Sequence, residues 1–126
     1  MKEYTRMQNN KGFDIPRHIR KHFLLDNNIA KWIINKNEAK VYLSFLKTEE
    51  ELVDYENDEE IVFFRKVHSN HSVTLPKKVF YFLRCENYYY IKWNINQNKI
   101  IIECFKKPHI SDISGIFPSK EDDFYA

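Results

Sequence analysis

Residues 9–28 read NNKGFDIPRHIRKHFLLDNN, and residues 69–88 read SNHSVTLPKKVFYFLRCENY. At an offset of sixty residues both stretches have a polar turn, an aliphatic residue followed by proline, a basic pair and then apolar residues at helical spacing. The aliphatic-proline pairs are Ile15-Pro16 and Leu75-Pro76. Such self-similarity predicts two copies of one structural unit.

Proline is tolerated best at the first position of a helix, because its missing N–H has no partner there in any case. We therefore expect short helices that start at Pro16 and Pro76. Their apolar faces are expected to be formed by Ile19, Phe23 and Leu24 in the first copy, and by Val79, Phe82 and Leu83 in the second.

A hairpin is expected after each helix. Residues 30–46 (AKWIINKNEAKVYLSFL) and 88–105 (YYYIKWNINQNKIIIECF) each contain two β-rich runs around an Asn-rich turn. Here the copies match at an offset of sixty-one, which a one-residue insertion explains. The matched positions are Lys31-Trp32 with Lys92-Trp93, Asn35 with Asn96, Asn37 with Asn98, and Val41 with Ile102. Each copy is thus predicted to be a β-α-β-β unit.

The chain of 126 residues divides into four segments: residues 1–47 (first repeat), 48–60 (acidic linker), 61–107 (second repeat) and 108–126 (acidic tail). Neither repeat is long enough to bury a sufficient core alone, so we expect both to share one globular core. The predicted fold is mainly β with short helices.

Composition removes several classes of function. Two glycines leave no Gly-rich phosphate loop, and no run approaches the roughly 18 apolar residues of a membrane span. The first residues lack the apolar region of a signal peptide, so we expect a cytoplasmic protein. Cys85 and Cys104 lack metal-site spacing and are expected to be reduced, buried thiols.

The charges are segregated along the chain. The first repeat carries +6 and the second +7, whereas the linker TEEELVDYENDEE carries −8 and the tail −3. Leu52, Val53 and Tyr55 lie among the linker's acids, so the linker is expected to be a helical connector or a solvated segment. A sharper hypothesis is that it folds over a basic surface as a nucleic-acid mimic.

The segments FDIPRHIRKHFLL and VTLPKKVFYFLRC resemble the strand, proline and short helix that precede a hairpin in the swapped-hairpin SpoVT/AbrB superfamily, which includes MraZ-like and MazE-type DNA-binding domains. The resemblance implies a pseudo-dimeric barrel formed by the tandem repeats of one chain, with a homodimer as the alternative. Asp14 stands in place of the usual Thr or Ser, Phe80 occupies the position of Arg20, and the glycine before the hairpin is missing.

The same resemblance implies binding of double-stranded DNA along the first strand, the following turn and the start of the helix. Lysines would anchor phosphates, and Arg17 and Arg20 would offer planar forks to phosphates or guanine edges. The implied DNA-binding residues are Arg6, Lys11, Arg17, Arg20, Lys21, Lys66, His71, Lys77 and Lys78.

Two alternatives to a DNA-binding transcriptional regulator remain open. One is an antitoxin that binds a toxin or another protein through aromatic residues of the tail, namely Phe117, Phe124 and Tyr125; the other is a protein-binding inhibitor that does not bind DNA. No catalytic set is suggested by position, so no enzyme activity is expected. His18 and His22 lie four apart but lack a third ligand, and neither a metal nor a cofactor is expected.

Overall fold

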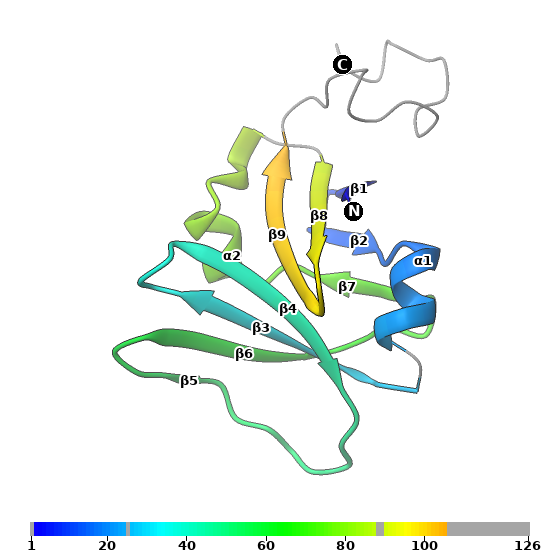
Figure 1. Ribbon diagram of the computed structural model, residues 1–126, viewed down its shortest axis with the longest axis horizontal. Coiled ribbons are helices and arrows are strands. Elements are labelled where there is room, and N and C mark those ends of the chain that lie inside the picture. Colours follow the sequence, from blue (N-terminus) through cyan, green and yellow to red (C-terminus); the bar gives the residue numbers. More distant parts are fainter. Residues whose placement is uncertain (1, 25, 88–89, 106–126) are drawn as a thin grey trace.

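The computed structural model describes residues 2–24, 26–87 and 90–105 of the chain (Figure 1). The first repeat contains two strands, a one-turn helix that continues as a π-helical turn, and a hairpin. These elements are β1 (Lys2–Arg6), β2 (Gly12–Asp14), α1 (Arg17–Ile19), η1 (Arg20–Leu24), β3 (Ile29–Asn35) and β4 (Lys40–Leu46).

The second repeat follows the same plan after one short strand in the linker. Its elements are β5 (Tyr55–Glu56) in the linker, then β6 (Glu60–Lys66), β7 (Ser72–Thr74), α2 (Lys77–Phe82), η2 (Cys85–Asn87), β8 (Tyr90–Asn96) and β9 (Lys99–Phe105). The expected mainly β fold is confirmed, and all strand pairs are antiparallel.

The helices begin one residue later than expected. Pro16 and Pro76 are the N-cap residues, with ψ of 143° and 145°, so both are extended and the helices start at Arg17 and Lys77. The fixed φ of proline suits this position as well as the first helical one. Ile19 and Val79, which occupy equivalent positions, are fully buried beneath these helices.

The strands form a seven-stranded sheet in the order β1-β8-β9-β4-β3-β6-β5 and a two-stranded sheet of β2 and β7. Within the described residues the large sheet keeps two edges, so the expected closed barrel is not observed. The first strand of each repeat pairs with the hairpin of the other: β1 with β8, and β6 with β3. Because the pairs Arg6–Tyr90 and Lys66–Ile29 are equivalent, the two repeats are related by a pseudo-two-fold axis.

The correspondence of the hairpins differs partly from the sequence expectation. The offset of sixty-one holds for β3 and β8, but the loop before β4 is two residues longer than the loop before β9. Val41 is therefore equivalent to Ile100 and pairs across the pseudo-two-fold axis with Ile102, to which the sequence comparison had matched it. The two extra loop residues change the offset between the copies after the turn, and the sequence comparison did not detect this change.

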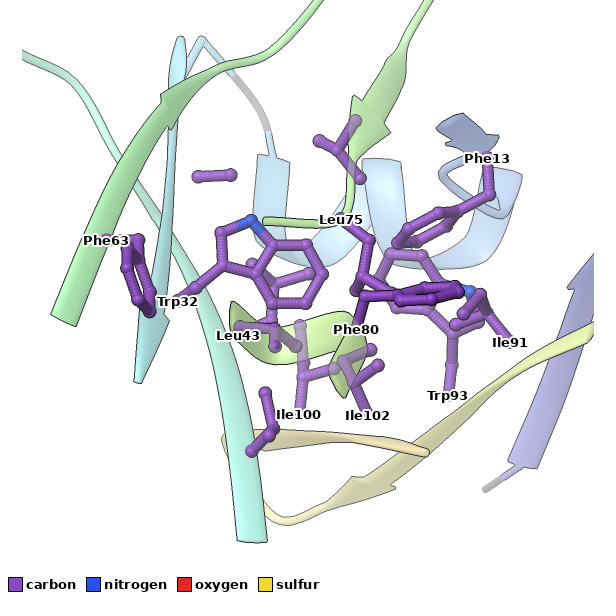
Figure 2. Packing of buried hydrophobic residues seen from close by; sticks show 14 of the residues in the cluster. Phe13, Trp32, Leu43, Phe63, Leu75, Phe80, Ile91, Trp93, Ile100 and Ile102 are labelled. Atoms are coloured by element: carbon purple, nitrogen blue, oxygen red, sulfur yellow. The ribbon is translucent and has the colours of Figure 1, made fainter. Parts of the chain in front are cut away.

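One core contains residues from both repeats (Figure 2). Trp32 and Trp93, at equivalent positions in β3 and β8, are fully buried, and the ring of Phe13 lies 6.1 Å from the Trp32 ring and 5.6 Å from the Trp93 ring. Alternate residues of β3 face this core, as Ala30, Trp32 and Ile34 do. The shared core explains why neither repeat is expected to fold without the other.

The acidic linker contains no helix, so the helical-connector expectation is wrong. It contains β5, which pairs with the outer edge of β6 through Tyr55–Val62 and Glu56–Ile61, and it ends at Glu60, the first residue of β6. Eight like charges disfavour a compact helix, whereas an extended strand spreads them along an edge.

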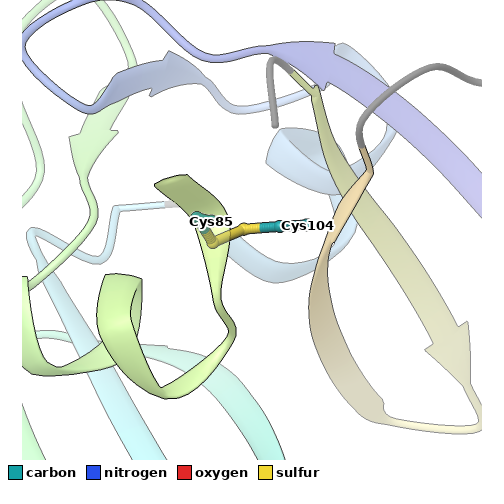
Figure 3. Close-up of a disulfide and its surroundings, with 2 residues drawn as sticks. All are labelled: Cys85 and Cys104. Carbon is teal, nitrogen blue, oxygen red and sulfur yellow. A yellow bond between two sulfur atoms is a disulfide. The ribbon is translucent and has the colours of Figure 1, made fainter. Parts of the chain in front are cut away.

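The two cysteines form a disulfide, which corrects the expectation of reduced thiols (Figure 3). The bond joins η2 to β9 and closes a sequence separation of 19 residues, with a Cα–Cα distance of 5.6 Å. Spacing alone had given no reason to pair them, because strand β9 reaches η2 only through the tertiary fold.

The helices of the described residues are too short and polar to cross a membrane.

Candidate nucleic-acid interface

Two equivalent turns lie between the first two strands of each repeat. Lys11 and His71 have positive φ values of 66° and 60° and donate backbone hydrogen bonds to Gln8 and His68, respectively, at 2.9 Å. Left-handed backbone at a non-glycine residue is uncommon. Its presence at both positions indicates that the two turns have the same conformation.

Each turn packs against the helix start of the other repeat. The amide of Ile15 donates to the carbonyl of His71, and the amide of Leu75 donates to the carbonyl of Lys11, both at 2.9 Å. In Figure 1 the ribbon of β2 and β7 accordingly runs between α1 and α2. The basic residues of the two repeats are therefore mixed into two composite clusters.

The α2 cluster consists of Lys11 from the first repeat and Lys77 and Lys78 from the second. Both α2 lysines are exposed, whereas Lys11 is half-buried and its Nζ lies 4.7 Å from the centre of the Phe80 ring. The Phe80 ring holds the ammonium group by a cation–π contact. This contact explains a departure noted in the sequence, because Phe80 replaces the arginine that its repeat position would carry.

The α1 cluster consists of His71 from the second repeat and Arg17 and Lys21 from the first, all exposed. Arg17 and Lys21 also line a surface cleft of about 710 Å³ between α1 and β1. The lining residues are Lys2, Glu3, Tyr4, Arg17, His18 and Lys21. Three permanent cations against one carboxylate make this cleft a site for anionic groups.

Arg20, which the resemblance implied as a second planar fork, is less accessible than Arg17. It is half-buried, and its Nε is fully buried without a hydrogen-bond partner among the described residues. Arg20 is thus less suited than Arg17 to a bidentate contact that uses Nε.

The remaining two candidates end the exchanged strands. Arg6 is the last residue of β1 and Lys66 the last residue of β6, and both are exposed. Arg6 shares a second surface cleft with Asp14. The Asp14 carboxylate lowers the positive potential near Arg6. The second repeat carries the neutral Thr74 at the position equivalent to Asp14.

The acidic linker engages cations that sequence reasoning did not single out. Asp54 accepts hydrogen bonds from the Arg65 Nη1 at 2.9 Å and from the Phe64 amide at 2.9 Å, and Glu56 accepts one from the Lys36 Nζ at 2.8 Å. The sequence did contain one indication of these contacts, because a run of eight acidic residues favours positions beside cationic side chains.

These contacts change the titration of both carboxyl groups. Burial disfavours the charged form of Asp54, but the hydrogen bonds from Phe64 and Arg65 outweigh it and lower the pKa of Asp54. The hydrogen bond and charge of Lys36 lower the pKa of Glu56, and the more distant charge of Lys78 adds to the effect.

The histidine pair on the first helix is close in space. The rings of His18 and His22 have centroids 4.7 Å apart. Within residues 2–24, 26–87 and 90–105, no group of three His, Cys, Asp or Glu side chains is arranged to hold a metal ion.

The candidate partner-binding residues Phe117, Phe124 and Tyr125 lie outside the described residues.

Comparison of the chain with protein-family models, with curated proteins and with solved structures found no match.

Proposed function

We propose that this protein is a non-enzymatic DNA-binding protein that acts as a transcriptional regulator, with the swapped-hairpin arrangement of AbrB-like proteins realised within one chain. The exchange of β1 and β6 between the repeats supports the arrangement, since each hairpin receives the first strand of the other repeat. A single chain then presents the two-fold surface that a homodimer would otherwise supply.

The observation that carries the proposal is the pair of basic clusters at the two ends of the β2–β7 ribbon. Lys11 and Ile15 lie four residues apart along an extended strand, which is roughly 13 Å. The helix starts that carry Arg17 and Lys77 follow at opposite ends of this ribbon. Two cationic clusters at this separation fall within one turn of B-form DNA, which is about 34 Å long.

The proposed roles follow from side-chain chemistry. The exposed lysines Lys21, Lys66, Lys77 and Lys78 neutralise phosphates as point charges, and Arg17 binds a phosphate or a guanine edge with its planar fork. Lys11 is held in place by Phe80 and contacts a phosphate beside α2. This activity requires binding alone, so no catalytic group is assigned.

The test is a titration of the full chain with mixed-sequence and upstream-region duplex DNA at several salt concentrations. Each neutralised phosphate contributes about 0.9 to the slope of log affinity against log salt. We expect a steep slope, corresponding to several phosphates. A flat salt response, or no binding at low salt, would contradict the proposal and favour a protein partner.

A matched pair of variants assigns the binding to the clusters. Arg17→Ala with Lys77→Ala should reduce the slope by about 1.8, because two phosphate contacts are lost. Both side chains are exposed, so the melting temperature should be unchanged. The control is Lys40→Ala with Lys99→Ala, which removes the same charge from equivalent exposed positions at the start of β4 and β9. Equal losses from both pairs would mean that the charge acts without a defined site.

A further inference from the structure

The first strands of the two repeats, β1 and β6, differ in what lies beside their outer edges. β5 from the acidic linker covers the outer edge of β6, and the charge of Lys78 at the start of α2 helps to lower the pKa of Glu56 in β5. The second repeat thus shows how this fold accommodates an acidic extended segment: as an added strand on the outer edge of β6.

The equivalent place in the first repeat is the cleft between β1 and α1. An offset of sixty residues relates β6 to β1 and Lys78 to His18, and His18 lines this cleft together with Lys2, Arg17 and Lys21. In the order of the sheet, β1 is the terminal strand among the described residues. The cleft therefore combines the geometry of the β5 site with a larger positive charge.

A matching acidic segment follows β9. The linker reads Leu52-Val53-Asp54-Tyr55 as it enters β5, and the tail reads Ile110-Ser111-Asp112-Ile113. Tyr55 follows the end of β4 by nine positions, and Ile113 follows the end of β9, the equivalent strand, by eight. The tail from residue 108 onward has a net charge of −3, which complements the cleft.

The chain is long enough to make this connection. Phe105 pairs with Tyr90, and Tyr90 pairs with Arg6, so β9 ends level with the end of β1 and two strands away from it. A position beside the outer edge of β1 is three strand spacings from β9, which is roughly 14 Å. Ile110, the first residue of the acidic segment, follows Phe105 by five positions, which span up to roughly 17 Å when extended.

We propose that residues 110–113 of the tail bind in this cleft, as a strand on the outer edge of β1, with Asp112 directed to the cations of α1 and Lys2. The site is thus a receptor for an acidic extended peptide, and the occupant is the protein's own C-terminal segment. A consequence, which rests on the proposed function, is that the bound segment covers Arg17 and Lys21 and competes with DNA for the α1 cluster.

The test of docking uses the full chain and no DNA. Amide hydrogen exchange is measured by NMR for the wild type, for Asp112→Lys, and for the control Asp122→Lys, which makes the same charge change farther along the tail. We expect Asp112→Lys to accelerate exchange in β1 about tenfold or more, with exchange in β3 unchanged, because only the edge strand loses a partner. Asp122→Lys should leave β1 unchanged.

Two results would overturn the docking proposal. The first is equal exchange in β1 for the wild type and both variants. The second is protection of β1 that rises with protein concentration, because the occupant would then be a second copy of the chain.

The competition is tested separately by titrating duplex DNA with the same two variants, which have equal net charge. Tighter binding by Asp112→Lys than by Asp122→Lys supports coverage of Arg17 and Lys21, and equal affinity overturns that part of the proposal. If neither variant nor the wild type binds DNA, the proposed function fails while the exchange data still decide the docking.

Discussion

The two repeats share a backbone plan but hold it in place by different chemistry. In the second repeat a disulfide ties η2 to β9 through Cys104. In the first repeat the amide group of Asn27 ties η1 to β4, the equivalent of β9, since its Nδ2 donates to the carbonyls of Phe23 in η1 and Phe45 in β4, both at 3.2 Å. Phe45 occupies the position of Cys104, so one repeat uses a covalent bond where the other uses hydrogen bonds.

The two tryptophans differ in the same way. Trp93 donates its Nε1–H to the Thr5 hydroxyl at 2.9 Å, whereas the buried Trp32 Nε1 has no hydrogen-bond partner among the described residues. Arg65 stands at the position of Thr5, and its guanidinium is turned to Asp54 in the linker. The comparison teaches that the apolar positions maintain the fold, while the polar links between elements have diverged.

The largest expected effect comes from the covalent link. Replacing Cys85 and Cys104 together by Ala should lower the free energy of unfolding by about 3 kcal/mol, because a bond that closes a loop of this length restricts the unfolded chain. Urea unfolding of the wild type and the double variant, each with and without reductant, measures the difference. If reductant leaves the wild-type free energy of unfolding unchanged, the disulfide does not stabilise the second repeat more than hydrogen bonds stabilise the first.

A smaller effect is expected from the hydrogen-bonded link. Asn27→Ala removes two hydrogen bonds to backbone carbonyls and should lower the free energy of unfolding by about 1–2 kcal/mol. Asn28→Ala, which changes a neighbouring exposed amide with hydrogen bonds to the backbone of Thr48, is the control in the same urea experiment. A loss as large as that of the disulfide variant would mean that both links are equally strong.

The tryptophan contrast should give a difference of about 1 kcal/mol. Trp93→Phe and Trp32→Phe remove the same indole volume from equivalent positions, but only Trp93→Phe also breaks a hydrogen bond. We expect Trp93→Phe to be the more destabilising in parallel thermal and urea unfolding. Equal losses of unfolding free energy would indicate that the Trp32 Nε1–H also donates a hydrogen bond of similar strength in solution.

The smallest effect concerns the linker strand on β6. Asp54→Asn should lower the free energy of unfolding by less than about 1 kcal/mol, since the ion pair with Arg65 is largely exposed to solvent. Folding lowers the pKa of Asp54, so this contribution is complete above the ordinary value of 3.8 and declines as the pH falls below it. The difference between wild type and Asp54→Asn should therefore shrink between pH 7 and pH 3. A difference that grows at low pH would refute the assignment.

Local patterns predicted the elements of the fold well. The aliphatic-proline pairs marked the helix starts to within one residue, and the β-rich runs around the Asn-rich turns located both hairpins. For the candidate site, Arg17 and Lys77, which the resemblance implied as DNA-binding residues, are both exposed. It did not anticipate that Lys11 packs on Phe80 or that the Arg20 Nε is buried, because these depend on packing across the two repeats.

The sequence by itself determined the repeat, the alternation of strands and helices, and the segregation of charge, because each is encoded by neighbouring residues with a short period. Only the tertiary structure decided the exchange of β1 and β6, the pairing of β4 with β9, the use of the linker as a strand and the disulfide between Cys85 and Cys104. These features join residues that lie far apart in the chain or in separate elements. Their partners are selected by the shared core and by hydrogen bonding at the sheet edges, which no local pattern specifies.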